Sequence, residues 1–487
     1  MQENSSHTKK VFLSGVFYSA LAKYSSLLVN IVITAILSRL LEPKDFGVVA
    51  IATMFLTFFS NLVTVGISPA IIQNKELEEE DYRGINSVVW ILALVLSFLF
   101  YLFVPVIESY FEYGEDFRNI LYLLCFCIFF SVATIVPNAL LMKDKKFRVV
   151  TIRTIIVNVS TGILAVFYAL NGGGVYALLV NPILGNFLIL IINYICRPVS
   201  FSLKFSFFNK ILSFATLQMV FNLIYLLYRE IDKFCIGNIL GPDKLGYYEK
   251  SYNVMLMPLT NVSAVLSPVL HPVLSDYQNN REYICNAYLR MLRLLSEVGF
   301  VISFLFYAFS DVLILTLYGD QWVPSIPVFQ MLSLSIAFQL MQSPIGAVMQ
   351  SINRLEALIY GSLIVLLSLV VCIGIGLSTK SLEITALMIT VSYVIGYWGY
   401  NYFVCKYLEI SVSEILRIIV KPLSIFVAVI VQLSIAKYFL ECGSLELFAC
   451  NIVIVVINSL FLYFTHSLPE AEKLCRKGLS KLNKNKN

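Results

Sequence analysis

The sequence predicts an all-α integral membrane protein of about fourteen transmembrane helices, built from two repeated six-helix lobes and a C-terminal helix pair. Three observations support this prediction: the composition, the number of apolar stretches, and a motif that recurs about halfway along the chain. Of the 487 residues, 59% are hydrophobic and only 13% are charged, whereas soluble domains carry roughly 25% charged residues. A chain of this composition belongs in a lipid bilayer.

Apolar stretches long enough to cross the hydrocarbon core, about 20 residues each, occur fourteen times. Six of them precede residue 200, six more precede residue 410, and two follow. We expect helices near 11–37, 46–72, 85–107, 119–141, 151–171, 175–196, 212–238, 250–272, 294–318, 325–350, 356–378, 383–405, 415–438 and 445–466.

The first apolar stretch resembles a secretory signal, because Lys9 and Lys10 precede it and Ala20-Leu-Ala22 imitates a cleavage site. The apolar run continues beyond Lys23 as far as Leu41, which is too long for a signal core. We therefore expect this segment to be retained as a structural helix.

Basic residues predict the orientation of the helices, since Lys and Arg concentrate in cytoplasmic connections. One set of alternate connections is basic, for example residues 143–148 and the tail at 473–486, whereas the connection at 108–116 on the other side is acidic. Both termini are therefore predicted to be cytoplasmic.

A short motif links the two halves of the chain. Leu41-Glu-Pro-Lys-Asp-Phe-Gly47 aligns with Leu240-Gly-Pro-Asp-Lys-Leu-Gly246, an offset of 240 − 41 = 199 residues, just after the first and the seventh predicted helix. Phe100-Tyr-Leu-Phe103 also aligns with Phe306-Tyr-Ala-Phe309, in the same order. Six helices are an even number, so both halves start on the same side of the membrane and are related by an axis along its normal.

This repeat defines the predicted domains. We expect an N-terminal lobe at 1–200, a C-terminal lobe at 201–410, a helix pair at 411–468 and a basic cytoplasmic tail at 469–487.

Polar residues form matching stripes on the first and seventh predicted helices. They recur every three or four residues and therefore share one helix face. The stripes consist of Ser19, Lys23, Ser26, Asn30 and Thr34 on the first helix, and of Gln218, Asn222, Tyr225, Arg229 and Lys233 on the seventh. Hydrocarbon would penalise both faces, so we expect them to line a lumen between the lobes.

The cations of these stripes are candidate anion-binding residues. A Lys or Arg at mid-membrane costs about 2.5–3.5 kcal/mol on a translocon scale, so Lys23, Arg229 and Lys233 need a partner or water. Two structural alternatives remain: an ion pair between Arg229 and Asp232, and a Lys23 side chain that extends to the cytoplasmic interface. Asn30 and Asn222 suit sugar hydroxyls or helix packing equally well.

Carboxylates are absent from the predicted spans of the first half, and none occurs between Asp144 and Glu230. A cation-coupled exporter would usually need one there. If transport is coupled to H⁺ or Na⁺ rather than to the membrane potential, Glu230, Asp232 and Glu297 are the candidate coupling residues.

Other function classes lack their sequence signals. The ten cysteines include no CxxC pair and the three histidines lie far apart, so no metal or cofactor is expected. There is no GxxxxGK[ST] phosphate loop for an ATP-driven pump. The net charge of +5 is dispersed between apolar runs, so nucleic acid is not an expected partner. A polymerase or glycosyltransferase would need a large external loop or a catalytic domain.

Three segments resemble the polysaccharide-transporter family, and most closely its branch of colanic acid and teichuronic acid exporters. They are Leu37-Ser-Arg-Leu-Leu-Glu-Pro-Lys-Asp-Phe-Gly-Val-Val-Ala50, Gly66-Ile-Ser-Pro-Ala-Ile-Ile-Gln73 and the run from Asp232 to Tyr252. The resemblance covers the first twelve helices and is weak over the last two. It implies a fold similar to multidrug and toxin extruders and to the lipid II flippase, all within one exporter superfamily.

The resemblance also implies a function: flipping of undecaprenyl-pyrophosphate-linked oligosaccharide repeat units across the bacterial cytoplasmic membrane for surface polysaccharide. Basic and polar residues of the lumen, here Lys23, Arg229 and Lys233, suit that substrate. Candidate protein partners are a polysaccharide polymerase and glycosyltransferases, besides membrane lipid. The alternatives are a cation-coupled multidrug antiporter of the same fold and a lipid scramblase without sugar selectivity.

Overall fold

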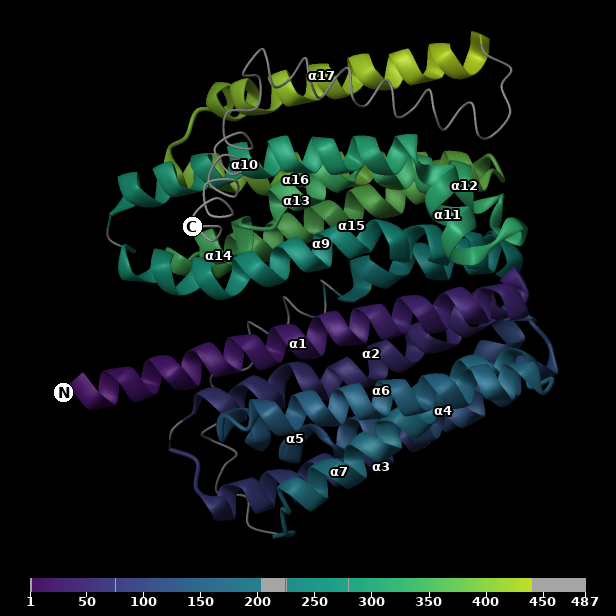
Figure 1. Ribbon diagram of the computed structural model, residues 1–487, viewed down its shortest axis with the longest axis vertical. Coiled ribbons are helices and arrows are strands. Elements are labelled where there is room, and N and C mark those ends of the chain that lie inside the picture. The colour runs from purple at the N-terminus through teal and green to yellow at the C-terminus, as the bar shows by residue number, and fades with distance from the viewer. Residues whose placement is uncertain (1, 75, 203–223, 225, 279, 440–487) are drawn as a thin grey trace, which may run out of the picture. The chain divides into compact units, whose positions relative to one another are not determined.

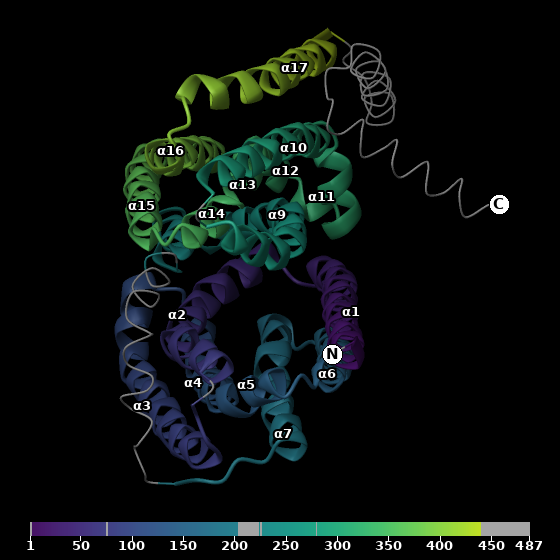
Figure 2. The ribbon, with the colours of Figure 1, turned by 90° about the vertical axis from the view of Figure 1, so that its left-hand side faces the viewer.

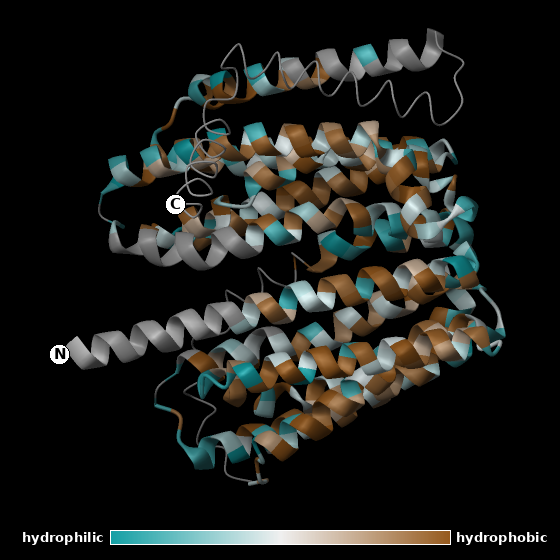
Figure 3. Cartoon of the chain, viewed as in Figure 1, coloured by the Kyte–Doolittle hydropathy of each residue, from teal (hydrophilic) through white to brown (hydrophobic). Residues whose placement is uncertain are grey.

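The computed structural model describes residues 2–74, 76–202, 224, 226–278 and 280–439, and every regular element in these residues is a helix (Figure 1). Nine of the described helices are long and apolar enough to cross a membrane, or ten if one bent pair is counted as a single span. Hydrophobic residues predominate in the coloured parts of the long helices, and many of the turns and helix ends are hydrophilic (Figure 3). The prediction of an all-helical membrane protein is confirmed.

Six of these spans occur between residues 18 and 196, one at each of the first six predicted positions. They are formed by α1 (Gln2–Leu40), α2 (Pro43–Gln73), α3 (Glu79–Phe111), α4 (Glu115–Ala133), α5 (Ile135–Lys143), α6 (Phe147–Leu170), η1 (Gly174–Leu179), η2 (Asn181–Gly185) and α7 (Asn186–Cys196). In this part of the chain α1 packs against α6, α3 packs against α4, and α2 contacts both α4 and α5 (Figure 2).

Two of these spans are interrupted where the sequence predicted continuous helices. The fourth breaks at Thr134, three residues before Pro137, and the sixth passes through a 3₁₀ turn and a π turn around Pro182 before α7 begins. Proline lacks the backbone N–H that continues an α-helix, so it disturbs the preceding turn. The interruptions do not appear in hydropathy, because the residues on either side remain apolar.

The chain divides into two compact units, Met1–Glu249 with Leu317–Gln321, and Lys250–Thr316 with Trp322–Asn487. The second unit contains the greater part of α9 (Pro242–Asp276) and α10 (Arg281–Ala308), followed by most of α11 (Ser310–Tyr318). Beyond Trp322 it contains α12 (Ser325–Ser333), α13 (Ile336–Gln342), α14 (Ile345–Ser351), α15 (Leu355–Ser378), α16 (Leu382–Leu408) and α17 (Val412–Phe439). The predicted helix at 445–466 and the predicted tail lie outside the described residues.

The predicted helix at 294–318 is wrong in its bounds. The helix begins at Arg281 and ends at Ala308, and a separate helix, α11, follows. The first turns of α10 are charged, so the hydropathy of the sequence did not predict them. Two side-chain contacts stabilise these turns as helix. The Asn280 side chain accepts a hydrogen bond from the backbone N–H of Tyr283, and Arg281 pairs with Glu409 at 2.7 Å.

The predicted span at 325–350 is bent. Its two parts meet at 42° near Leu334, and a second interruption at Ser343 and Pro344 separates α13 from α14. Ser333 and Ser335 each donate a hydroxyl hydrogen bond to the carbonyl oxygen three residues earlier, at 2.7 Å. Such bonds compete with the helical ladder and bend helices.

Both copies of the repeated motif form the connection between two consecutive helices. α1 ends at Leu40 and α2 starts with Pro43 in its first turn; residues 226–240 form a helix, and α9 starts with Pro242. Proline is favoured at the first helical position, because its missing N–H would have no partner there. Each motif is therefore a tight corner between two antiparallel helices.

Candidate functional site

α1 has two chemically different faces. Apolar side chains project from one face into exposed positions, among them Leu28 at 63% and Val32 at 56% exposure. On the opposite face Asn30 is exposed, while Lys23 and Ser26 are half-buried, and Ser26 accepts a hydrogen bond from Asn158 of α6 at 3.0 Å. The helix thus suits lipid on one side and a polar medium on the other.

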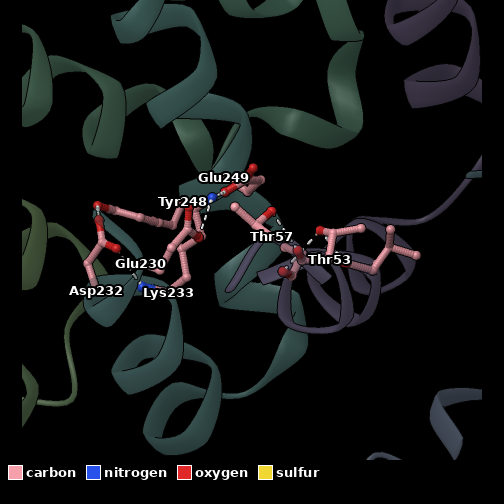
Figure 4. A network of polar contacts seen from close by, with 9 residues as sticks. Thr53, Thr57, Glu230, Asp232, Lys233, Tyr248 and Glu249 are labelled. Atoms are coloured by element: carbon pink, nitrogen blue, oxygen red, sulfur yellow. Dashed lines mark hydrogen bonds and ion pairs between the residues drawn. The ribbon is translucent and has the colours of Figure 1, made fainter. Parts of the chain in front are cut away.

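The helix at 226–240 and the start of α9 carry a charged network (Figure 4). The Lys233 Nζ lies 3.2 Å from a carboxylate oxygen of Glu230 on the same helix and 3.4 Å from one of Glu249 on α9. All three side chains are less than one-fifth exposed. The ammonium group is therefore held between two carboxylates from two helices.

Asp232 forms the second part of this network. Its side chain is buried at 1% exposure, and it accepts hydrogen bonds from the Tyr248 hydroxyl and, at 2.8 Å, from the Lys233 backbone N–H. Figure 4 shows Thr53 and Thr57 of α2 beside these residues, with both hydroxyls bonded to backbone carbonyls of α2. Asp232 thus ties the helix at 226–240 to α9.

The structure brings together part of the predicted site. On this helix Lys233 forms an ion pair with Glu230, three residues earlier. Asp232, which the sequence offered as a partner for Arg229, accepts a hydrogen bond from Tyr248. Arg229 is half-buried on the same helix. Glu297 is buried at 2% exposure on α10, in the other unit, and Asn222 lies outside the described residues.

Glu249 and Tyr248 were missed in the sequence, although a signal existed. The corner at Gly241 makes the two helices antiparallel, so residues at equal distances from it face one another. Lys233 lies eight residues before Gly241 and Glu249 eight residues after it. A lysine and a glutamate at matched positions of a helical hairpin predict an ion pair between the helices.

The network changes how Lys233 contributes to anion binding. The network itself contains three carboxylates, those of Glu230, Asp232 and Glu249, around the backbone and ammonium group of Lys233. An incoming anion would have to compete with Glu230 and Glu249 for the Lys233 ammonium group. Lys23 has no acidic neighbour in sequence between Val11 and Leu41, so no carboxylate of that stretch competes with an anion for it.

A second buried cation, Arg153 on α6, was also missed. Its side chain is 8% exposed, and its Nη1 donates to the side-chain oxygens of Asn138 and Asn193, at 3.1 Å in the case of Asn138. Asn193 in turn donates to the Thr134 hydroxyl at 2.8 Å. Among the described residues no carboxylate pairs with Arg153, and its buried Nε has no hydrogen-bond acceptor. The cation is stabilised by neutral amides that connect α5, α6 and α7.

The helical spans define an integral membrane protein, whose α1 has a polar face and which holds charged groups in its interior. Residues 36–327 match the model of the family described as "Polysaccharide biosynthesis protein". The chain belongs to this family, the polysaccharide-transporter family of Wzx-type flippases that the sequence resembled. The family consists of bacterial multi-pass membrane transporters rather than enzymes.

Curated relatives agree with this assignment. The chain is 23% identical over 487 residues to the teichuronic acid biosynthesis protein TuaB of Bacillus subtilis (strain 168), covering 96% of this chain and 98% of the relative. It is 22% identical to the lipopolysaccharide biosynthesis protein WzxC of Escherichia coli (strain K12), covering 71% of this chain and 70% of that protein.

Solved structures show the same fold. A structure of the lipid II flippase MurJ in an inward closed conformation has a TM-score of 0.70 at 15% identity and covers 92% of this chain and 99% of its own. An inward-facing multidrug resistance transporter of the MATE family has a TM-score of 0.60 at 17% identity, with 79% and 95% covered. The predicted likeness to multidrug extruders and the lipid II flippase is confirmed at the level of the fold.

Proposed function

We propose that the protein flips undecaprenyl-pyrophosphate-linked oligosaccharide from the cytoplasmic to the outer leaflet of the bacterial inner membrane by alternating access. In this proposal fourteen helices form two six-helix lobes and a final pair, with both termini cytoplasmic. The exported unit serves surface polysaccharide such as capsule, O-antigen, colanic acid or teichuronic acid. The names of the relatives support this class of substrate.

The polar head group of the lipid-linked oligosaccharide is the part of the substrate that needs a transporter. A hydrated oligosaccharide and a charged pyrophosphate must cross roughly 30 Å of hydrocarbon, where unpaired polar groups cost several kcal/mol. The polyprenyl tail, by contrast, is stable in lipid throughout. A transporter for such a molecule needs a polar route that stays open to lipid along one side.

The two faces of α1 are the observation that carries this proposal. Its exposed apolar face suits the lipid that holds the tail, and its opposite face presents Lys23 and Asn30. Lys23 and Arg229 attract the pyrophosphate, while Asn30 and Asn222 bind sugar hydroxyls. Lys233 contributes to the positive potential only when an anion displaces Glu230 or Glu249.

The energy source follows from the sign of the charge. The cell interior is negative, so moving one negative charge outward is favoured by about 2.3 kcal/mol per 100 mV. The membrane potential can therefore drive export if Lys23 and Arg229 do not move with the substrate. Glu230, Asp232 and Glu297 are the carboxylates that would couple transport to H⁺ or Na⁺ instead.

One observation favours a second function, a cation-coupled multidrug antiporter. The network of Glu230, Asp232 and Glu249 places three carboxylates on one helical hairpin, and a MATE transporter has the same fold. The sequence of the first lobe argues against it, since its predicted spans contain no carboxylate.

Transport in proteoliposomes separates the two functions. We expect the native protein to move a fluorescent polyprenyl-pyrophosphate oligosaccharide between leaflets, measured as protection from a membrane-impermeant quencher. A polyprenyl-phosphate without sugar and a cationic dye with a Na⁺ or proton gradient are the controls. Movement of the dye alone would establish the antiporter, and equal flipping of lipids with and without the glycan would establish a scramblase.

A further inference from the structure

A polar face runs along α2, the helix that follows the first corner. Its residues recur at steps of three or four and therefore share one side of the helix. They are Thr53, Thr57, Asn61 and Thr64, which we call the α2 track. No charged residue occurs between Asp45 and Lys75, so the α2 track is polar but neutral, unlike the cationic stripe of α1.

The α2 track lies on the side of the helix that is turned away from α3. Phe55 and Phe59 contact Phe100 of α3, with ring centroids 6.4 and 5.2 Å apart. Each of them is two residues from Thr57, and two residues correspond to about 200° around an α-helix. Between Asp45 and Ile71 no described residue of α2 is exposed. The track therefore faces the interior of the protein rather than lipid.

The hydrogen-bond donors of the α2 track are used within the helix itself. Each threonine hydroxyl donates to the carbonyl oxygen four residues earlier, at 2.7 Å for Thr53 and at 2.8 Å for Thr57 and Thr64. The Asn61 side-chain nitrogen donates to the carbonyl oxygen of Thr57 at 2.8 Å. The hydroxyl and amide oxygens keep lone pairs that can accept further bonds. The track therefore presents mainly acceptors to a ligand.

The second repeat has the same arrangement on α9. Asn61 lies 61 − 43 = 18 residues after Pro43, and Asn261 lies 261 − 242 = 19 residues after Pro242. The Asn261 side-chain nitrogen donates to the carbonyl oxygen of Met257, four residues earlier, at 2.8 Å. Its buried side-chain oxygen accepts no hydrogen bond from the described residues. A buried acceptor without a donor is costly, so a ligand that brings donors would stabilise it.

We propose that the α2 track binds the oligosaccharide of the transported lipid by accepting hydrogen bonds from sugar hydroxyls. The inference rests on the proposed function and adds a neutral surface for the glycan to the cations that attract the pyrophosphate. The track adjoins the charged network, since Thr53 and Thr57 lie beside Lys233 and its partners (Figure 4). Sugar hydroxyls supply the donors that the track lacks, whereas neither an ion nor a cationic drug matches a neutral row of acceptors.

Two valine substitutions and a chemically modified lipid test the α2 track. Thr57→Val combined with Thr64→Val removes two hydroxyls at nearly constant shape. Thr154→Val is the matched control, because Thr154 of α6 makes the same bond to the carbonyl oxygen four residues earlier, at 2.8 Å. The probes are a polyprenyl-pyrophosphate hexose disaccharide and the same lipid with its sugar hydroxyls O-methylated, which removes the donors. The dissociation constants are measured by fluorescence titration of the purified full-length protein, with the thermal unfolding midpoint on the same samples.

We expect the native protein and Thr154→Val to bind the lipid with free hydroxyls about tenfold more tightly than the O-methylated lipid, as for the loss of two neutral hydrogen bonds. The double valine variant should bind both lipids equally weakly, and serine at both positions should restore the preference. A preference that persists in the double valine variant, or equal binding of both lipids by the native protein, would overturn the proposal. Binding does not require transport, so a protein that fails to flip lipid can still pass or fail this test.

Discussion

Asn193→Leu is expected to destabilise the protein by about 3 kcal/mol, because it removes an amide that solvates the buried Arg153 cation. Hydrogen bonds to charged groups contribute about 1.5–3 kcal/mol, and Asn193 also bonds Thr134. The free energy of unfolding can be measured by SDS titration in mixed micelles. Asn119→Leu, at an exposed position, is the matched control and should have little effect.

A double variant tests the role of Asn193 beside Arg153 more stringently. Replacing a buried charge together with its partners by apolar groups is often neutral or stabilising, whereas removing one partner is costly. Arg153→Met combined with Asn193→Leu should therefore recover most of the stability lost in Asn193→Leu alone. A double variant as unstable as the sum of both single variants would contradict the assignment of Asn193 as the group that stabilises Arg153.

Lys233→Leu is the second change with a large expected effect. It leaves the carboxylates of Glu230 and Glu249 facing each other without the ammonium group between them, which should cost about 3 kcal/mol. The cost should fall sharply when both glutamates are also changed to glutamine, because the interaction is not additive. Lys44→Ala, at the exposed start of α2, is the control for loss of a positive charge.

Transport by the triple variant Glu230→Gln, Lys233→Gln, Glu249→Gln then separates two roles of the network. Native rates of flipping would assign the three residues to structure. A folded triple variant that no longer flips lipid would assign them to substrate binding or coupling. If Lys233→Leu were as stable as the native protein, in contrast, the ion pairs of the hairpin would contribute nothing to the free energy of unfolding.

Hydropathy predicted where helices cross the membrane, but not where they break. The six spans from residue 18 to residue 196 occur at their predicted positions, because a span needs about 20 apolar residues whatever their order. The breaks at Thr134 and near Leu334 depend on hydrogen bonds of single residues, which an average over a window does not register. The first turns of α10 were missed for a different reason, since their charged residues lower the hydropathy.

The repeat was the most productive signal in the sequence. It predicted two equivalent corners, and the structure adds that Gly47 and Gly246 touch the opposite corner reciprocally. Charges on one helix were also visible in the sequence, but their partners needed more than a search for nearby acids. Lys233 pairs across a hairpin with Glu249, which only the matched spacing about Gly241 indicates, and Arg153 is stabilised by the neutral residues Asn138 and Asn193.

The most direct test of the proposed function is the rate at which labelled polyprenyl-pyrophosphate oligosaccharide is flipped in proteoliposomes by the native protein, Lys23→Ala and Arg229→Ala. Protein amount and folding are matched, and Lys44→Ala controls for the loss of one charge. We predict that the native protein and Lys44→Ala flip the lipid, whereas Lys23→Ala and Arg229→Ala do not. Flipping at the native rate by both variants, or movement only of small cations or dyes by the native protein, would contradict the account.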